Sequence, residues 1–134
     1  MDKAIPSSNR AVKPSGIFSQ GLKVRNLIFI SGQIAKNANG EVVGKGDIRA
    51  QTRQCIENLN AVLEAGGATL GNVVNVTVYV THIEHLKAID EVRAEYLEEK
   101  YPASTLVEVS RLTNQNCMIE MEPLPSCNQE GRAI

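Results

Sequence analysis

The spacing of apolar residues in the middle of the chain predicts two amphipathic helices. The first covers residues 48–65, with Asp47 as its N-cap and Gly66-Gly67 as its stop. The second covers residues 84–99, and Pro102 prevents it from continuing. The apolar sides carry Ile48, Ile56, Leu59, Val62 and Leu63 in the first helix and Leu86, Ile89, Val92 and Tyr96 in the second.

Around these helices, alternating and β-branched segments predict the strands. Residues 73–81 alternate most clearly, so that successive side chains point to opposite faces of a sheet. One face carries Val74, Val76, Val78 and Val80, and the other carries Asn75, Thr77, Tyr79 and Thr81. Further strands are predicted within residues 18–24 and at 27–34, 105–112 and 117–122.

The order strands, helix, strand, helix, strands predicts an α+β fold in one domain spanning residues 1–134. Two helices cover only one face of a small sheet. The other face carries Phe29, Tyr79, Val107 and Val109, which are apolar enough to need a partner, often a second copy of the same chain. The patterning alone therefore predicts a homo-oligomer.

Composition narrows the environment and the partners. The chain has 134 residues and a net charge of −1, which gives no electrostatic footprint for nucleic acid or for an anionic membrane. No apolar run is long enough to span a membrane, and the N-terminus lacks the apolar core of a signal peptide. We therefore expect a cytoplasmic protein.

Candidate metal ligands and reactive thiols are few. Cys55, Cys117 and Cys127 are odd in number and widely spaced, which argues against a disulfide framework and against a zinc site. His82 and His85 have a spacing that can share a metal, but no third ligand is evident in the sequence. Surface histidines and reduced thiols are the favoured interpretation, and we expect neither a metal nor a cofactor.

The last third of the chain carries a recognisable signature. It consists of Tyr101-Pro102-Ala103-Ser104-Thr105-Leu106-Val107-Glu108-Val109 followed by Ile119-Glu120-Met121-Glu122. Earlier landmarks in the same order are Phe18-Ser19-Gln20-Gly21, Ser31-Gly32-Gln33, Gln51-Thr52-Arg53-Gln54 and Val78-Tyr79-Val80. Together they resemble the Rid/YjgF family of small imine and enamine deaminases along nearly the whole chain. The resemblance implies a chorismate-mutase-like (bacillary type) fold, a mixed sheet with two helices on one face, and a homotrimer with a cleft between each pair of subunits.

The resemblance also implies a set of cleft residues. Those that bind substrate would be Phe18, Ser31, Gly32, Asp90, Ser104, Thr105 and Leu106. Glu120 would be the catalytic residue, acting as general acid and base and positioning a water. From alternation alone, Glu120 and Glu122 share one strand face and would both pass as ordinary exposed carboxylates. The resemblance singles out Glu120.

Three residues depart from the family pattern. Ser104 stands where proven deaminases carry an arginine that holds the substrate carboxylate, and a serine offers one hydroxyl donor instead of a charged fork. Phe18 replaces a common tyrosine, and Asp90 replaces a common asparagine and would repel a carboxylate. Arg10 and Lys13 could supply charge if the N-terminal arm folds over the cleft, whereas Arg111 is too far along the strand to replace the arginine.

Three functions follow from this pattern. The first is hydrolysis of an imine or enamine with release of ammonia, and a substrate like that of 2-aminomuconate deaminase is a specific candidate. The second is a non-catalytic paralogue that binds a small metabolite or a partner protein, which the loss of the arginine favours and the retained Glu120 opposes. The third, RNA cleavage, is the least favoured because the sequence has no basic patch.

Overall fold

The computed structural model describes residues 5–97 and 101–126. The strands are β1 (Gly21–Val24), β2 (Leu27–Ile30), β3 (Gln33–Ile34), β4 (Val73–Val80), β5 (Ala103–Glu108) and β6 (Ile119–Pro125). The helices are α1 (Ile48–Ala65) and α2 (Leu86–Leu97), with short 3-10 turns at Leu70–Asn72 and Ile83–His85. The predicted order of strands and helices is confirmed.

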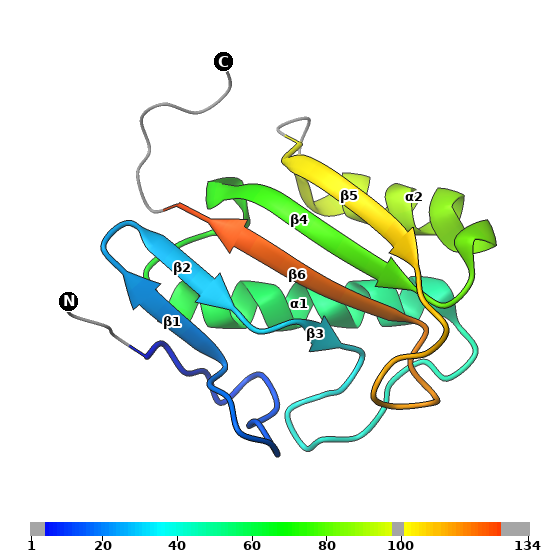
Figure 1. Cartoon of the computed structure of the whole chain (residues 1–134), viewed down its shortest axis with the longest axis horizontal. Helices are drawn as coiled ribbons and strands as arrows, with labels where there is room; N and C mark the ends of the chain where they lie inside the picture. The colour runs from blue at the N-terminus through cyan, green and yellow to red at the C-terminus, as the bar shows by residue number, and fades with distance from the viewer. Residues whose placement is uncertain (1–4, 98–100, 127–134) are drawn as a thin grey trace.

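The strands form a mixed sheet with both helices on one face (Figure 1). Its four-stranded part has the order β3-β6-β4-β5, in which β4 and β5 are parallel and the other neighbours are antiparallel. Strands β1 and β2 make a separate antiparallel ribbon, which a single bridge between Leu27 and Ser126 connects to the end of β6. Helix α2 is the crossover that joins the parallel strands β4 and β5, as such a pair requires.

Helix α1 has the predicted bounds because both of its ends are fixed locally. The Asp47 carboxylate accepts a hydrogen bond from the Ala50 N–H at 3.1 Å, which caps the first turn. At the other end the chain continues through Gly67 with a φ of 81°, a conformation that favours glycine.

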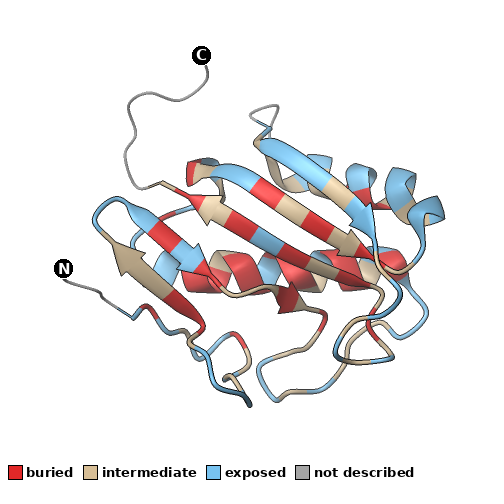
Figure 2. Cartoon of the chain, viewed as in Figure 1, coloured by how far each residue is buried: buried red, intermediate tan, exposed pale blue. Residues whose placement is uncertain are grey.

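Valines of β4 and apolar residues of α1 and β6 make the core, and the burial alternates along these strands (Figure 2). Val76, Val78 and Val80 are buried, as their predicted shared face requires. The prediction was wrong for Val74, which is 43% exposed. The cause is a bulge between Val73 and Asn75 that takes Val74 out of the alternating register.

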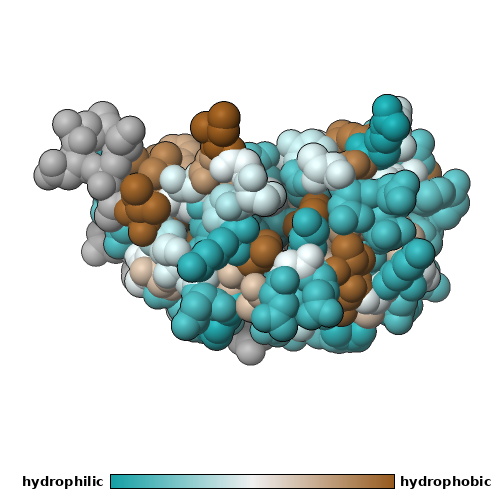
Figure 3. Space-filling model, turned by 90° about the horizontal axis from the view of Figure 1, so that it is seen from below, coloured by the Kyte–Doolittle hydropathy of each residue, from teal (hydrophilic) through white to brown (hydrophobic). Residues whose placement is uncertain are grey.

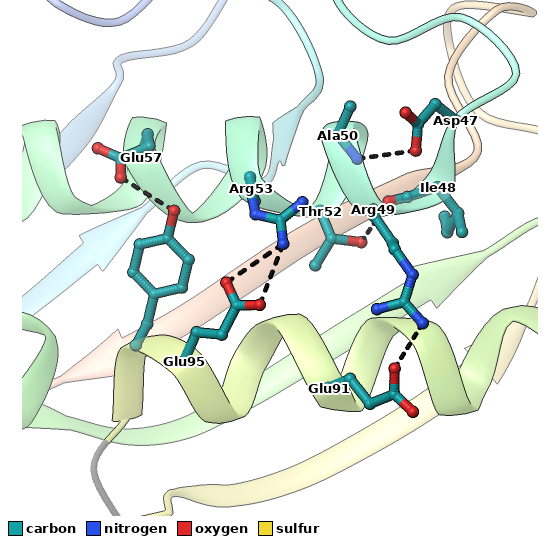
Figure 4. A network of polar contacts seen from close by, with 10 residues as sticks. Asp47, Ile48, Arg49, Ala50, Thr52, Arg53, Glu57, Glu91 and Glu95 are labelled. Atoms are coloured by element: carbon teal, nitrogen blue, oxygen red, sulfur yellow. Dashed lines mark hydrogen bonds and ion pairs between the residues drawn. The ribbon is translucent and has the colours of Figure 1, made fainter.

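Polar contacts also join the two helices across their exposed sides (Figure 4). They are the ion pairs Arg49–Glu91 and Arg53–Glu95 and a hydrogen bond from the Tyr96 hydroxyl to Glu57 at 3.1 Å. Exposed pairs of this kind each contribute at most about 1 kcal/mol. The burial of Ile89 and Val92 therefore contributes more to holding α2 in place.

Several predicted bounds differ from the observed ones. The predicted strand 27–34 is interrupted at Ser31 and Gly32 and continues as β3. The predicted strand 105–112 begins at Ala103 and ends at Glu108, and the predicted strand 117–122 runs instead over β6. β6 extends through Pro123 and Pro125. Strand β3 pairs β6 only opposite Glu120 and Met121, so on that side of β6 no β3 residue needs an N–H from the two prolines.

Within the described residues, no helix combines the length and the apolar character needed to cross a bilayer. Seen from below, the surface shows small hydrophobic groups separated by hydrophilic atoms (Figure 3). Among the described residues seen in this view, the hydrophobic atoms therefore form separate small groups.

Candidate active site

Glu120 lies on the face of the sheet that the helices leave open. It pairs with Tyr79 of β4, and Tyr79 points away from the helices because its neighbours Val78 and Val80 are fully buried in the core beneath them. Glu122, two residues further along β6, points to the same open face. The predicted shared face of the two glutamates is confirmed.

Two effects raise the pKa of the Glu120 carboxyl above its usual range. The larger is desolvation by partial burial, and the second is the negative charge of Glu122. A carboxyl with a raised pKa exchanges its proton nearer to neutral pH, as a general acid or base must. Glu122 accepts a hydrogen bond from the Tyr79 hydroxyl at 3.3 Å, and its charge is the main cause of the raised pKa of Tyr79. Tyr79 is therefore a neutral donor.

The turn between β2 and β3 packs against the Glu120 carboxylate. A Cβ added to Gly32 would lie only 2.4 Å from Oε2 of Glu120, so the absence of a side chain at this position makes room for the carboxylate. The Ser31 hydroxyl donates to the backbone carbonyl of Ser19 at 2.6 Å, which fixes the segment next to Phe18. We call Ser31, Gly32 and Glu120 the glutamate half-site; Phe18 precedes Ser19 in the chain and is 57% exposed.

Ser104 lies on the opposite face of the same sheet. It pairs with Val76 of β4 in parallel register, and Val76 is buried on the helix side. Leu106 is half-buried on that side as well, whereas Thr105 lies on the open face with its partner Thr77. Alternation therefore divides the predicted segment 104–106 between two faces.

An arginine that no sequence motif marked lies beside Ser104. Nη2 of Arg93 donates to Oγ of Ser104 at 3.1 Å, and Nη1 lies 3.6 Å from Oδ1 of Asp90. Only 12% of the Arg93 side chain is exposed. A signal existed in the sequence, because Arg93 follows Ile89 by four residues and so falls on the apolar stripe of α2. We call Asp90, Arg93, Ser104 and Leu106 the serine half-site.

The two half-sites cannot meet within one chain, because Ser104 and Glu120 are on opposite faces of one sheet. A second copy could bring them together by placing its serine half-site over the glutamate half-site of the first.

Arg10 and Lys13 of the N-terminal arm lie beside α1 and not beside Glu120. Arg10 forms an ion pair with Glu64 of α1, and both residues line a shallow hollow with Lys13. The pairing directs the Arg10 charge toward α1 and away from Glu120.

The rings of His82 and His85 lie edge to face with centroids 5.8 Å apart. Among the described residues, no group of three or more His, Cys, Asp or Glu side chains could hold a metal ion.

Two of the cysteines are buried thiols. Burial is the main cause of a pKa well above the usual value for Cys55, and it also raises the pKa of Cys117. Protonated thiols are poor nucleophiles, so neither cysteine is arranged for covalent catalysis. Cys127 lies outside the described residues.

Known proteins resemble this chain along most of its length. Residues 8–125 match the family model described as endoribonuclease L-PSP. A RutC family protein of Pyrococcus abyssi is 46% identical over 125 residues, which cover 92% of this chain and 97% of that protein. A 2-iminobutanoate/2-iminopropanoate deaminase of Dermatophagoides farinae is 34% identical over 122 residues, 91% of this chain and 94% of that protein.

The fold is also that of solved structures. The crystal structure of E. coli TdcF with bound serine is similar with a TM-score of 0.86 and 29% identity, over 92% of this chain and 98% of that one. The chain therefore belongs to the endoribonuclease L-PSP family, which is the Rid/YjgF family that its sequence resembles.

Proposed function

We propose that the chain is an imine or enamine deaminase. It hydrolyses the C=N bond of a small imine, or of the imine tautomer of an enamine, to a carbonyl compound and ammonia. The observation that carries the proposal is the half-buried Glu120 carboxyl, which has a raised pKa and packs against Gly32. The existence of relatives named as 2-iminobutanoate/2-iminopropanoate deaminases supports it.

The reaction requires one group that moves protons between water and nitrogen. Glu120 takes a proton from a water, and the water oxygen forms a bond to the imine carbon. The imine nitrogen gains this proton from the carboxyl, which gives a carbinolamine. Glu120 then takes the hydroxyl proton of the carbinolamine and passes it to the amino nitrogen, so that the carbonyl forms, the C–N bond breaks and ammonia leaves. Water is consumed, ammonia is released and Glu120 returns to its starting state. A pKa between the ordinary carboxyl value and neutrality suits both transfers.

We also propose a homotrimer in which each cleft combines half-sites from two subunits. The support is geometric, because Ser104 and Glu120 lie on opposite faces of the sheet in one chain. The open face carries Val107, which is 38% exposed, and Phe29 on β2 is 48% exposed. A second copy would cover such residues.

The test is ammonia release from a panel of imines and enamines generated in situ, including short 2-imino acids and 2-aminomuconate. Glu120→Gln keeps the size of the side chain and removes the proton exchange, so acceleration should be lost. Glu122→Gln is the matched control, because it removes a carboxylate from the same strand face and should keep most activity. Sedimentation analysis of each variant checks that the oligomer is unchanged. Equal activity of Glu120→Gln and the unmodified protein would contradict the proposal.

A second candidate function is a binding protein without catalysis. It is favoured by Ser104, which the resemblance to the family aligns with the arginine of proven deaminases. It predicts that a folded trimer binds small carboxylates but accelerates no hydrolysis in the panel. RNA cleavage has less support, since the net charge of −1 gives no attraction for a phosphate backbone.

A further inference from the structure

Helix α2 brings a cation to the place where the sequence of β5 has none. Strand β5 is an edge strand that lies beside α2 (Figure 1), and Arg93 of α2 contacts it. Its Nη2 atom donates to Oγ of Ser104 at 3.1 Å. Because serine is short, the guanidinium occupies space beside β5 that a longer side chain at position 104 would itself fill.

The described partners of Arg93 use only part of its bonding capacity. A guanidinium carries five N–H donors. The described residues give it one hydrogen bond, to Ser104, and one contact of 3.6 Å, to Asp90. The Asp90 side chain is 56% exposed, so water weakens this ion pair.

The surroundings of Arg93 favour an additional anion. Burial lowers the pKa of Arg93, and the charge of Asp90 acts in the opposite direction. Arginine nevertheless stays protonated at neutral pH. The Arg93 side chain is only 12% exposed, so its charge is stabilised when a carboxylate accepts hydrogen bonds with both oxygens from the planar guanidinium.

A hollow of about 330 Å³ opens beside the guanidinium, within the range of small-ligand sites. One part of its wall is apolar, from Leu97 and Pro102, and another part is polar, from Asp90, Arg93 and Ser104. A small organic acid has both kinds of surface, and its charged end fits the polar part.

We propose that Arg93 holds the carboxylate of the substrate, with the Ser104 hydroxyl as a second donor, so that the substrates are carboxylate-bearing imines or enamines. This inference rests on the proposed deaminase function and names its anion-binding residue. The carboxylate replaces Asp90 as the main partner of the guanidinium. The imine carbon then extends toward the glutamate half-site of the adjoining subunit.

The experiment compares Arg93→Gln with Arg53→Gln. Gln removes the charge in both, and Arg53 is a matched control because its ion pair with Glu95 joins the same two helices on their exposed side. For a 2-imino acid, Arg93→Gln should raise KM about 10- to 100-fold, as expected for lost bonds to a charged group. For an imine without a carboxylate, KM should not change. Arg53→Gln should leave both values unchanged.

Two further variants separate binding from folding. Arg93→Lys keeps the charge without the fork and should give an intermediate KM; it also serves as the test if Arg93→Gln does not fold. The double variant Arg93→Gln with Ser104→Arg returns a guanidinium from the strand side and should restore the KM. A purely structural role for Arg93 predicts no such rescue.

A binding measurement distinguishes this inference from the proposed function. Calorimetric titration with pyruvate, the 2-oxo acid product of 2-iminopropanoate, needs no turnover. If pyruvate binding depends on Arg93 while no imine is hydrolysed, the deaminase proposal fails and the anion site stands. If imines are hydrolysed but Arg93→Gln changes neither KM nor pyruvate binding, the deaminase stands and Arg93 is overturned as the carboxylate-binding residue.

Discussion

Replacing Gly32 by alanine tests the placement of the Glu120 carboxylate directly. The added Cβ would lie 2.4 Å from Oε2, 2.9 Å from Cδ and 3.1 Å from Cγ of Glu120. Ordinary van der Waals contact begins near 3.4 Å, so Oε2 must withdraw by the difference, about 1 Å. Such a displacement of a catalytic group can reduce the rate by about 10²-fold. We expect a loss of that order in kcat.

Stability should change little in the same variant. The nearest atoms are at the end of a flexible side chain, and moving Glu120 from its rotamer costs about 0.5–1.5 kcal/mol. Gly32 is not among the glycines with positive φ, so alanine also gains about 0.4–1 kcal/mol by restricting the unfolded chain. The two effects nearly cancel, and the free energy of unfolding should stay within about 1 kcal/mol of the original.

The assay is steady-state ammonia release together with urea unfolding. Gly71→Ala is the control, because its Cβ would meet only Thr69 Oγ1, at an ordinary 3.6 Å. It should leave kcat unchanged and raise the free energy of unfolding by about 0.4–1 kcal/mol, the effect of alanine on the unfolded chain. Full activity of Gly32→Ala would refute the inferred position of the carboxylate. A loss of several kcal/mol in stability would refute the reasoning that only a side-chain tip must move.

Three other substitutions give defined results. The pKa of Glu120 is raised in the folded protein, so folded Glu120 keeps its proton to higher pH than unfolded Glu120. The Glu120 carboxyl therefore lowers stability as pH rises from the ordinary glutamate pKa through the raised one. Glu120→Gln should melt at a higher temperature than the original protein at neutral pH, and this difference should disappear in acid. Glu122→Gln removes a charge that raises the pKa of Glu120, so the acidic limb of the pH–rate profile should move to lower pH, and no movement would contradict the coupling. Buried Gln51 donates a hydrogen bond to the Asn116 carbonyl and accepts one from the Met118 N–H, both at 2.8 Å. Gln51→Ala should therefore lower the free energy of unfolding by about 1–3 kcal/mol in urea titration. An unchanged free energy would show that water replaces both bonds.

The sequence predicted those elements whose ends are fixed by local chemistry. Helix α1 matches to the residue because Asp47 caps it and Gly66-Gly67 ends it. Predictions failed where contacts distant in sequence decide the backbone. The strand at 27–34 is interrupted because Ser31 bonds back to Ser19 and Gly32 packs on Glu120, and periodicity does not reveal either contact.

In the candidate site, too, the sequence predicted what local alternation decides and missed what contacts distant in sequence decide. The motif at residues 119–122 was enough to place Glu120 and Glu122 together on one face, since alternation along a strand is local. The sequence motifs do not mark Arg93, because its partner Ser104 is eleven residues away in sequence and lies on another element. Helical spacing places Arg93 on the apolar side of α2, but it does not identify Ser104 as the residue that Arg93 contacts.

The placement of the two half-sites on opposite faces of the sheet has a genetic consequence for the proposed trimer. Each chain would lend Glu120 to one neighbour and Arg93 to the other, so every chain takes part in two clefts. When subunits lacking Glu120 assemble with subunits lacking Arg93, some clefts combine the intact half of each. At substrate concentrations far below the raised KM, the two alleles expressed together should then be more active than either allele alone, and the activity recovered should be proportional to the number of intact clefts in the mixed assemblies.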